Sequence, residues 1–317
     1  MKAKVKKQPQ EMDLMKLMEQ FGSEEKCRMY LEKLRWPEGV ICIRCQSDKI
    51  SQIYKRNQFA CDSCQYHFSV TAGTIFHDSH LPLPKWFAAI YLMCESRKGI
   101  SANQLKRTLH VAYKTAWYLC HRIRKAVADA DTSLLSGIVE VDETFVGGKA
   151  KNMHAKERAE KITGKGGLAN KQIVLGAIQR GGGVRLVVEK RTDRATLHRF
   201  IKAALDDSTE AIMTDSWPPY AGCGDENTRH ETVDHKQGEY VRGECHTNTV
   251  ESVWSLFKRS IVGSYHQISA KHLDRYLDEF EFRFNNRNNP YLFRDTLLRL
   301  IASENLEYKE LTKEEAA

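Results

Sequence analysis

Residues 138–142 read Ile-Val-Glu-Val-Asp and residues 211–215 read Ala-Ile-Met-Thr-Asp, so each stretch is an apolar run that ends in an aspartate. Short apolar runs of this kind predict buried strands. Between them the sequence predicts strands over 172–179 and 184–189 and a helix over 193–205. Adjacent strands followed by alternating helix and strand are typical of an α/β sheet with helices on its faces. Because active groups gather at strand ends in such sheets, Asp142 and Asp215 are candidate site residues.

A third acidic residue, Glu251, lies near the start of an amphipathic segment that reaches Lys258. Helical spacing collects the apolar side chains on one stripe and leaves Asn248, Glu251 and Lys258 on a neighbouring polar face. Three carboxylates can converge on divalent metal ions, the arrangement used for phosphoryl transfer on nucleic acids. Taken singly, the residues have simpler explanations. An aspartate after a strand is often a turn residue, and Asn248 followed by Glu251 reads as a capping box.

Length and charge narrow the class of protein. A chain of 317 residues with 41% apolar content suits a large domain with smaller appendages. No long uncharged apolar run and no secretory signal are apparent, so a cytoplasmic protein at the nucleoid is expected, without membrane contact. Residues 1–130 carry 22 Lys+Arg against 12 Asp+Glu, and the rest carries 27 against 29. This imbalance favours a nucleic-acid-docking region beside a separate working domain, although a basic surface kept for solubility would give the same charge.

Four cysteines form two CxxC pairs with fifteen residues between the inner cysteines. Each pair puts two thiolates on one tight turn, and residues 49–60 can form a hairpin that brings both turns around one tetrahedral Zn²⁺. A disulfide pair is the alternative, which an intracellular setting disfavours. The spacing therefore predicts a closed, structural zinc site with the ligands Cys42, Cys45, Cys61 and Cys64.

A helical module follows the cysteine region. Apolar spacing after Pro84 predicts a helix that stops before Gly99, then a short helix capped by Ser101 and a long helix over 113–128. Two helices joined by a short turn, the second of them basic, resemble a helix-turn-helix whose second helix enters the major groove. An ordinary helical bundle with a solvated basic face would give the same pattern. The candidate DNA-binding residues here are Lys114, Arg122, Arg124 and Lys125.

Two further segments complete the predicted organisation. Residues 147–170 are rich in Lys, Arg and Gly and read either as a loop that contacts DNA, through Lys149 and Lys151, or as a plain solvated loop. The residues after Asn305 predict a frayed end. We therefore expect a basic flexible N-terminus over 1–24, a zinc ribbon region over 25–75, a helix-turn-helix-like module over 80–130, a catalytic domain over 136–300 and a C-terminal tail over 301–317.

Several motifs together resemble one known family. Over residues 25–300 the chain is similar to bacterial insertion-sequence transposases of the ISXO2-like type, which join an N-terminal zinc ribbon to a DDE catalytic domain of ribonuclease-H-like fold. Besides the paired cysteines, the resemblance rests on residues 74–79 (Thr-Ile-Phe-His-Asp-Ser), 141–148 (Val-Asp-Glu-Thr-Phe-Val-Gly-Gly), 214–215 (Thr-Asp) and 246–258 (His-Thr-Asn-Thr-Val-Glu-Ser-Val-Trp-Ser-Leu-Phe-Lys).

The resemblance implies that Asp142, Asp215 and Glu251 hold catalytic Mg²⁺ or Mn²⁺ and that Lys258 accompanies them. Relatives also use Asn or His at the third position, so Asn248 is the alternative ligand. Glu143 is expected to face away from Asp142, because successive strand residues point to opposite faces. The family implies cleavage and joining of double-stranded DNA, at element terminal inverted repeats and target sites, by a dimer or larger assembly. A catalytically silent DNA-binding regulator and a nuclease of the same fold are the alternatives.

Overall fold

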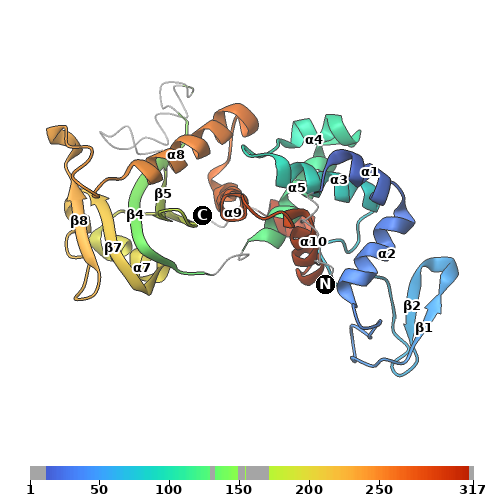
Figure 1. Cartoon of the computed structure of the whole chain (residues 1–317). Helices are drawn as coiled ribbons and strands as arrows, with labels where there is room; N and C mark the ends of the chain where they lie inside the picture. Colours follow the sequence, from blue (N-terminus) through green and yellow to red (C-terminus); the bar gives the residue numbers. More distant parts are fainter. Residues whose placement is uncertain (1–11, 129–132, 149–153, 155–170, 314–317) are drawn as a thin grey trace, which may run out of the picture. The chain divides into compact units, whose positions relative to one another are not determined.

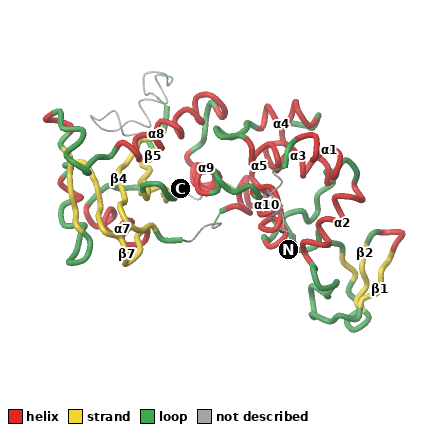
Figure 2. The backbone as a smooth tube through the Cα atoms, in the orientation of Figure 1, coloured by secondary structure: helices red, strands yellow, loops and turns green. Residues whose placement is uncertain are grey.

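The computed structural model describes residues 12–128, 133–148, 154 and 171–313, and the chain divides into two compact units (Figure 1). Unit 1 comprises residues 1–130 together with 288–317, and unit 2 comprises residues 131–287. Unit 1 is mainly helical with a small three-stranded sheet, whereas unit 2 is built on a five-stranded sheet (Figure 2). None of the helices in the described ranges is long and apolar enough to cross a membrane.

The cysteine-bearing part of unit 1 is a small antiparallel sheet. Its strands are β1 (Ile50–Ile53), β2 (Gln58–Cys61) and β3 (His67–Phe68). The turn between β1 and β2 contains Asn57 at a φ of 52°, a left-handed conformation that asparagine tolerates well. Trp36 packs edge-on against Phe59 and Phe68, with ring centroids 5.5 and 5.9 Å away. The predicted hairpin between the two CxxC turns is confirmed.

The remaining helices of unit 1 share one hydrophobic core. Ser101 caps its helix as predicted, because its hydroxyl accepts a hydrogen bond from the Gln104 amide. His110 ends that helix in the left-handed conformation, with a φ of 50°. The helices are α1 (Leu14–Phe21), α2 (Glu24–Arg35), α3 (Leu83–Glu95), α4 (Ala102–Leu109), α5 (Tyr113–Val127), α10 (Leu292–Ala302) and α11 (Tyr308–Thr312).

Both terminal segments contain packed helices within the described residues, 12–24 and 301–313. Within the predicted flexible segment 1–24, α1 is capped by Asp13 and buries Leu17 and Phe21. At the other end, Leu306 and Leu311 are 0% and 1% exposed, so residues 306–313 are packed and not frayed, whereas residues 314–317 of the predicted tail lie outside the described residues. The first segment has six apolar residues between Met12 and Phe21, whereas the second has only Leu306, Tyr308 and Leu311 among charged residues. Both segments find apolar partners in the core of unit 1, and this packing could not be deduced from either segment alone.

Unit 2 contains a mixed sheet in the order β6-β5-β4-β7-β8. β4 pairs antiparallel with β5 and parallel with β7, which places it at the centre. The bounds are β4 (Leu135–Val146), β5 (Gln172–Gln179), β6 (Val184–Glu189), β7 (Leu205–Asp215) and β8 (Arg229–Val233). The strands predicted over 172–179 and 184–189 are confirmed, and the strand predicted over 211–214 is the end of the longer β7.

Helices cover both faces of this sheet. α7 (Arg194–Ala204) packs on one face, and α8 (Asn248–Ser260) and α9 (Leu273–Asn285) pack on the other. The central strand alternates between them, since Val139 and Val141 point into the core beneath α7 whereas Glu140 and Asp142 contact α8. The expected α/β class, a mixed sheet with flanking helices, is confirmed. A short π-helix (Ile261–Tyr265) continues from α8.

Candidate active site

The two aspartates lie level with each other on neighbouring parallel strands. β4 and β7 pair in the register Val139↔Ile212 and Glu140↔Met213, and the same offset aligns Asp142 with Asp215. Both strands run in the same direction, so both carboxylates lie toward the same edge of the sheet. The apolar run before Asp142 is the buried middle of β4, which continues to Val146, whereas the run before Asp215 is the buried end of β7. The prediction that Asp142 ends its strand is therefore wrong.

The third acidic residue is brought to the same place by α8. A cleft of about 620 Å³ is lined by Asp142, Glu251 and Lys258, three of the four predicted catalytic residues. Asn248, the alternative ligand, is exposed and is not among the residues that line the cleft. The other described residues around it are Glu143, Thr144, Trp254, Ser255, Arg259 and Val262.

Asp142 is held by a side chain of α8. The indole Nε1 of Trp254 donates a hydrogen bond of 2.9 Å to Asp142 Oδ2. Gly176, the cross-strand neighbour of Asp142 on β5, makes room for this indole, because a Cβ there would lie 2.4 Å from the ring. Trp254 therefore covers the sheet beside Asp142 and leaves its second carboxylate oxygen available to the cleft.

Burial and neighbouring negative charges raise the pKa values of Asp142 and Glu143. Burial raises the pKa of Asp142 to about 6, and the charges of Asp215 and Glu251 add to the rise, while the Trp254 hydrogen bond opposes it. Burial also raises the pKa of Glu143 to about 7, although this carboxylate accepts a 2.6 Å hydrogen bond from Tyr220. That bond turns Glu143 toward the core beneath α7, as the alternation of strand residues predicted.

These carboxylates have the chemistry that a divalent cation requires. Hard oxygen donors crowd at one sheet edge, and their mutual repulsion is relieved when a cation binds. Asp142 and Glu251 line the cleft, and Asp215 follows the apolar end of the strand next to that of Asp142. The three carboxylates are not drawn tightly together, because in the described parts of the chain only the cysteines of unit 1 bring three or more potential metal-ligand atoms within 4.8 Å of one another. The residues present therefore fit Mg²⁺ or Mn²⁺ by their donor type and charge.

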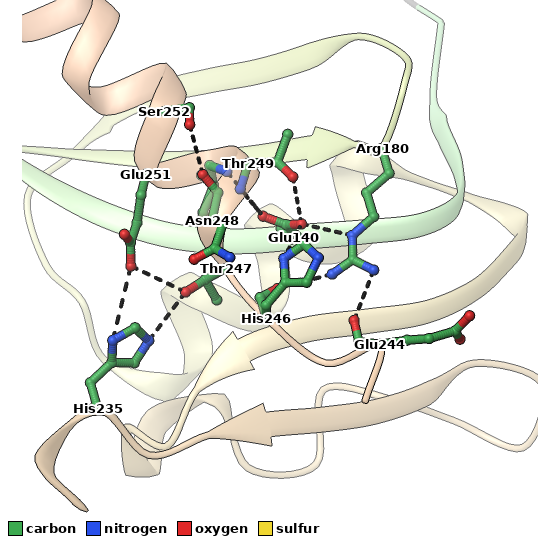
Figure 3. A network of polar contacts seen from close by, with 11 residues as sticks. Glu140, Arg180, His235, Glu244, His246, Thr247, Asn248, Thr249, Glu251 and Ser252 are labelled. Atoms are coloured by element: carbon green, nitrogen blue, oxygen red, sulfur yellow. Dashed lines mark hydrogen bonds and ion pairs between the residues drawn. The ribbon is translucent and has the colours of Figure 1, made fainter. Parts of the chain in front are cut away.

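The capping box, the alternative explanation of Asn248 and Glu251, is not formed at the start of α8. The N-cap residue is Thr247, and its side chain makes no capping hydrogen bond. Instead, the Thr247 hydroxyl donates to Glu251 Oε1 over 3.4 Å, and His235 Nδ1 lies 4.0 Å from the same oxygen (Figure 3). Glu251 thus has polar neighbours on the loop side, and its carboxylate is exposed toward the cleft.

Glu140, a buried carboxylate that was not among the predicted site residues, caps the first turn of α8. Glu140 is 0% exposed and accepts hydrogen bonds from the backbone amides of Thr249 and Val250, at 2.7 and 3.0 Å. Arg180 Nε donates to it over 2.7 Å (Figure 3). The only sequence signal was a glutamate inside an apolar run, where a buried charge requires partners.

In unit 1, the four predicted zinc ligands form one cluster. Their sulfur atoms all lie within 4.8 Å of one another, with Cys42 to Cys64 at 3.6 Å and Cys45 to Cys61 at 3.5 Å. Four sulfurs at about 2.3 Å from a tetrahedral Zn²⁺ stand roughly 3.8 Å apart, so this spacing fits the ion. The cluster has the form of a closed structural site.

The basic face predicted for α5 is wrong in part. Arg122 and Arg124 are 3% and 1% exposed, so neither side chain is presented to a DNA groove. Lys125 is half-buried and donates to the carbonyl of Asn305, whereas Lys114 is exposed and lies 4.2 Å from the Tyr308 ring centroid. The C-terminal segment covers this face, which helical spacing alone could not reveal. The predicted DNA contacts Lys149 and Lys151 lie outside the described residues.

Arg122 is therefore expected to matter for stability. Its guanidinium donates to the carbonyl of His77 and to Asn305 Oδ1, both at 2.6 Å. Arg122→Ala should lower the free energy of unfolding by about 2–4 kcal/mol, because a buried side chain is lost and two part-buried acceptors lose their donor. The exposed Arg107 of α4 is the control, and its alanine variant should change stability by less than about 0.5 kcal/mol. Denaturant unfolding measures both. Unchanged stability in Arg122→Ala, with weakened DNA binding, would restore the DNA-facing interpretation.

Comparison with known proteins agrees with both units. Residues 134–285 match the family model of the ISXO2-like transposase domain, and residues 22–67 match that of the transposase zinc-ribbon domain. A protein described as "Uncharacterized protein in transposable element ISH50", from Halobacterium salinarum, is 30% identical over 274 residues, which are 83% of this chain and 91% of that protein.

Two solved structures are similar over part of the chain. A chain of the simian T-cell lymphotropic virus intasome in complex with PP2A regulatory subunit B56 gamma is 17% identical, with a TM-score of 0.26 over 62% of this chain and 63% of that one. A chain of a pre-cleavage Mos1 transpososome is 11% identical, with a TM-score of 0.28 over 70% of this chain and 79% of that one. The present chain thus spans less than two thirds of the viral chain, and TM-scores this low carry no weight for function. The family matches and the related protein do: this chain belongs to the ISXO2-like insertion-sequence transposases, enzymes of the DDE type that carry a zinc ribbon.

Proposed function

We propose that this transposase cuts DNA at the ends of its element and joins the freed 3′ ends to target DNA by an in-line, metal-dependent mechanism. The observation that carries this proposal is the cleft of unit 2, where Asp142 and Glu251 face the cations Lys258 and Arg259. No hydrogen bond or ion pair engages the side chain of either cation within the described residues. Unpaired cations beside crowded carboxylates suit a bound phosphodiester whose charge both groups of residues must manage.

Each residue has a role in this proposal. Asp142, Asp215 and Glu251 would hold Mg²⁺ or Mn²⁺ as hard oxygen ligands. When bound, such ions supply the Lewis-acid chemistry that activates a water for cleavage and a 3′-hydroxyl for joining. Lys258 and Arg259 would bind and orient the phosphate, and Trp254 would keep Asp142 in one rotamer. The chain itself needs no covalent nucleophile for this chemistry.

The proposed partners follow from the reaction. Double-stranded DNA is the substrate, first at the terminal inverted repeats of the element and then at the target. Two element ends must be processed together, so a homodimer or larger assembly on DNA is proposed, acting in the cytoplasm at the nucleoid. Zn²⁺ in the cysteine cluster would hold the ribbon in the shape that docks on DNA.

An assay of DNA joining tests this function. Wild type, Asp215→Ala and Asp207→Ala are incubated with Mg²⁺ and a plasmid that carries the DNA flanking the reading frame on both sides. Asp207 is a matched control, because it is an exposed aspartate of the same strand, β7, away from the site. Joined products are expected with wild type and Asp207→Ala and should disappear with Asp215→Ala, since one metal ligand is lost.

The other outcomes identify the alternatives. Cut DNA that is never joined, in reactions where Asp215→Ala is inactive, would make the protein a nuclease of the same fold. Specific DNA binding without cutting by any of the three proteins would favour a catalytically silent DNA-binding regulator. Joining that survives in Asp215→Ala would contradict the metal-ligand role of this residue.

A further inference from the structure

Glu140 makes an unusual set of contacts for a residue in the middle of a central strand. It is 0% exposed, and its two neighbours along β4, Val139 and Val141, are core residues. Its carboxylate accepts hydrogen bonds from the amides of Thr249 and Val250 and from the Thr249 hydroxyl, the last at 2.7 Å (Figure 3). Each of these donors belongs to the first turn of α8.

This arrangement supplies the cap that the helix lacks in its own sequence. The N-cap Thr247 makes no side-chain capping bond, so the free amides of the first turn need another acceptor. The carboxylate of Glu140 provides it from the sheet, where the positive end of the helix dipole also favours a negative charge. A buried carboxylate costs several kcal/mol unless it is paired, and these amides together with Arg180 offset that cost.

Arg180 links the Glu140 carboxylate to the loop before α8. Besides its 2.7 Å bond to Glu140, its guanidinium donates to the carbonyls of Glu244 and His246, at 2.9 and 3.1 Å. His246 Nδ1 also lies 3.2 Å from Glu140 Oε1. The residues that enter α8 and the first turn of the helix are thus held at one point of β4 (Figure 3).

A second contact fixes the helix further along, at a matching spacing. Asp142, two residues after Glu140, accepts the hydrogen bond from Trp254, four residues after Val250. Two strand residues span about 6.7 Å and four helical residues span about 6 Å. The two contacts therefore coincide only in one register of α8 on β4, and Glu251 lies between them.

We propose that Glu140 is a positioning residue: by capping α8 from β4, it sets the register that holds Glu251 across from Asp142, so that both can bind the same divalent cation. This inference rests on the proposed metal-dependent function. Glu140 itself is buried beneath the helix start and is not a metal ligand in this proposal. Its loss should weaken metal binding through Glu251.

The test compares two glutamates that each tie a helix to a strand, the buried Glu140 and the half-buried Glu281. Glu281 on α9 accepts hydrogen bonds from Arg185, at 2.6 Å, and from the Leu186 amide, at 2.9 Å, and so ties a different helix to a different strand. Glu140→Gln and Glu281→Gln should each lower the melting temperature. Mn²⁺ titrations of the full-length, zinc-loaded protein, followed by calorimetry and by the electron paramagnetic resonance of free Mn²⁺, should show at least tenfold weaker binding only in Glu140→Gln.

A milder variant covers the case in which Glu140→Gln does not fold. Thr249→Val keeps the side-chain shape and removes only the hydroxyl bond to Glu140, so it should weaken Mn²⁺ binding severalfold. Equal Mn²⁺ affinity in wild type, Glu140→Gln and Thr249→Val would overturn the positioning role. So would an equal loss in Glu281→Gln, since the effect would then be general destabilisation.

Asp142→Asn separates this inference from the function on which it rests. If wild-type protein binds Mn²⁺ and Asp142→Asn weakens that binding, the metal site is established, and the Glu140 variants decide the positioning role alone. If Asp142→Asn binds Mn²⁺ as wild type does, the proposed metal site fails first.

Discussion

Asp142→Asn is expected to abolish DNA cleavage and joining, with a rate loss on the order of 10³-fold or more, because a central ligand for the catalytic ions is removed. The same variant should be more stable than wild type when metal is absent. Burial raises the pKa of Asp142 from 3.8 to about 6, so at neutral pH the folded protein carries a charge that it disfavours. Asparagine removes that charge and can still accept the Trp254 hydrogen bond.

The extra stability of metal-free Asp142→Asn should increase with pH. The pKa of Asp142 is higher in the folded protein than in the unfolded chain, so the folded state binds more protons between the two values. The contribution of Asp142 to the free energy of unfolding of the wild type is therefore fully present below about pH 4, and it is lost as the pH rises through about 6. The stability advantage of Asp142→Asn should be near zero at pH 4 and reach about 3 kcal/mol at most above pH 7.

Thermal and denaturant unfolding of metal-free protein between pH 4 and 8 measure this difference. Asp207→Asn, which alters an exposed aspartate of β7, should track wild type throughout. Added Mg²⁺ should stabilise wild type and leave Asp142→Asn nearly unchanged. A variant that is less stable than wild type at every pH would show that the Asp142 carboxylate has favourable partners which outweigh its burial.

Loss of zinc is the second change with a large expected effect. Structural Zn²⁺ sites in small domains contribute about 10–16 kcal/mol of apparent binding free energy, and this energy folds the surrounding chain. The ribbon has only three short strands and the aromatic cluster of Trp36, Phe59 and Phe68 to replace it. Cys42→Ser, or removal of zinc by a chelator, should therefore unfold residues 40–70.

Zinc content and limited proteolysis measure this outcome. Wild type should bind one Zn²⁺ per chain and resist cleavage within residues 40–70, whereas Cys42→Ser should lose both properties. The sheet of unit 2 has its own core and should unfold at an unchanged temperature. Cys223→Ser is the control, because this half-buried thiol belongs to unit 2 and is not one of the four cysteines of the cluster. Full zinc content and protease resistance in Cys42→Ser would mean that the cysteines do not form the proposed site.

Local sequence patterns predicted much of the fold and several residues of the candidate site. The strands over 172–179 and 184–189, the helix from Asp193 and the CxxC hairpin were predictable because short-range periodicity and caps determine them. The position of Asp215 followed from a strand end and that of Glu251 from a helical face, whereas β4 continues four residues past Asp142. Their gathering at one cleft was implied by family resemblance, and the roles of the individual residues stay predictions.

Long-range partners account for what the sequence could not give. Glu140 accepts hydrogen bonds from Arg180 and Thr249, which are 40 and 109 residues away along the chain. The sequence around Glu140 contains no signal for these partners. Arg122 reads as part of a solvated basic face until Asn305, 183 residues later, is seen to bind it. Helical spacing therefore predicts which face of its helix a charged residue lies on. Whether that face is buried depends on which distant segment packs over it.

The return of α10 and α11 to unit 1 has a consequence for how the protein is made. A ribosome synthesises the whole of unit 2 before it reaches Phe293, Leu297 and Leu306, which complete the core of unit 1. The sheet that carries the carboxylates can thus form while the first-made helices still lack their last partners. A translation product that stops at Arg287 would carry the residues proposed for catalysis on an intact scaffold, joined to an N-terminal half that cannot close its core.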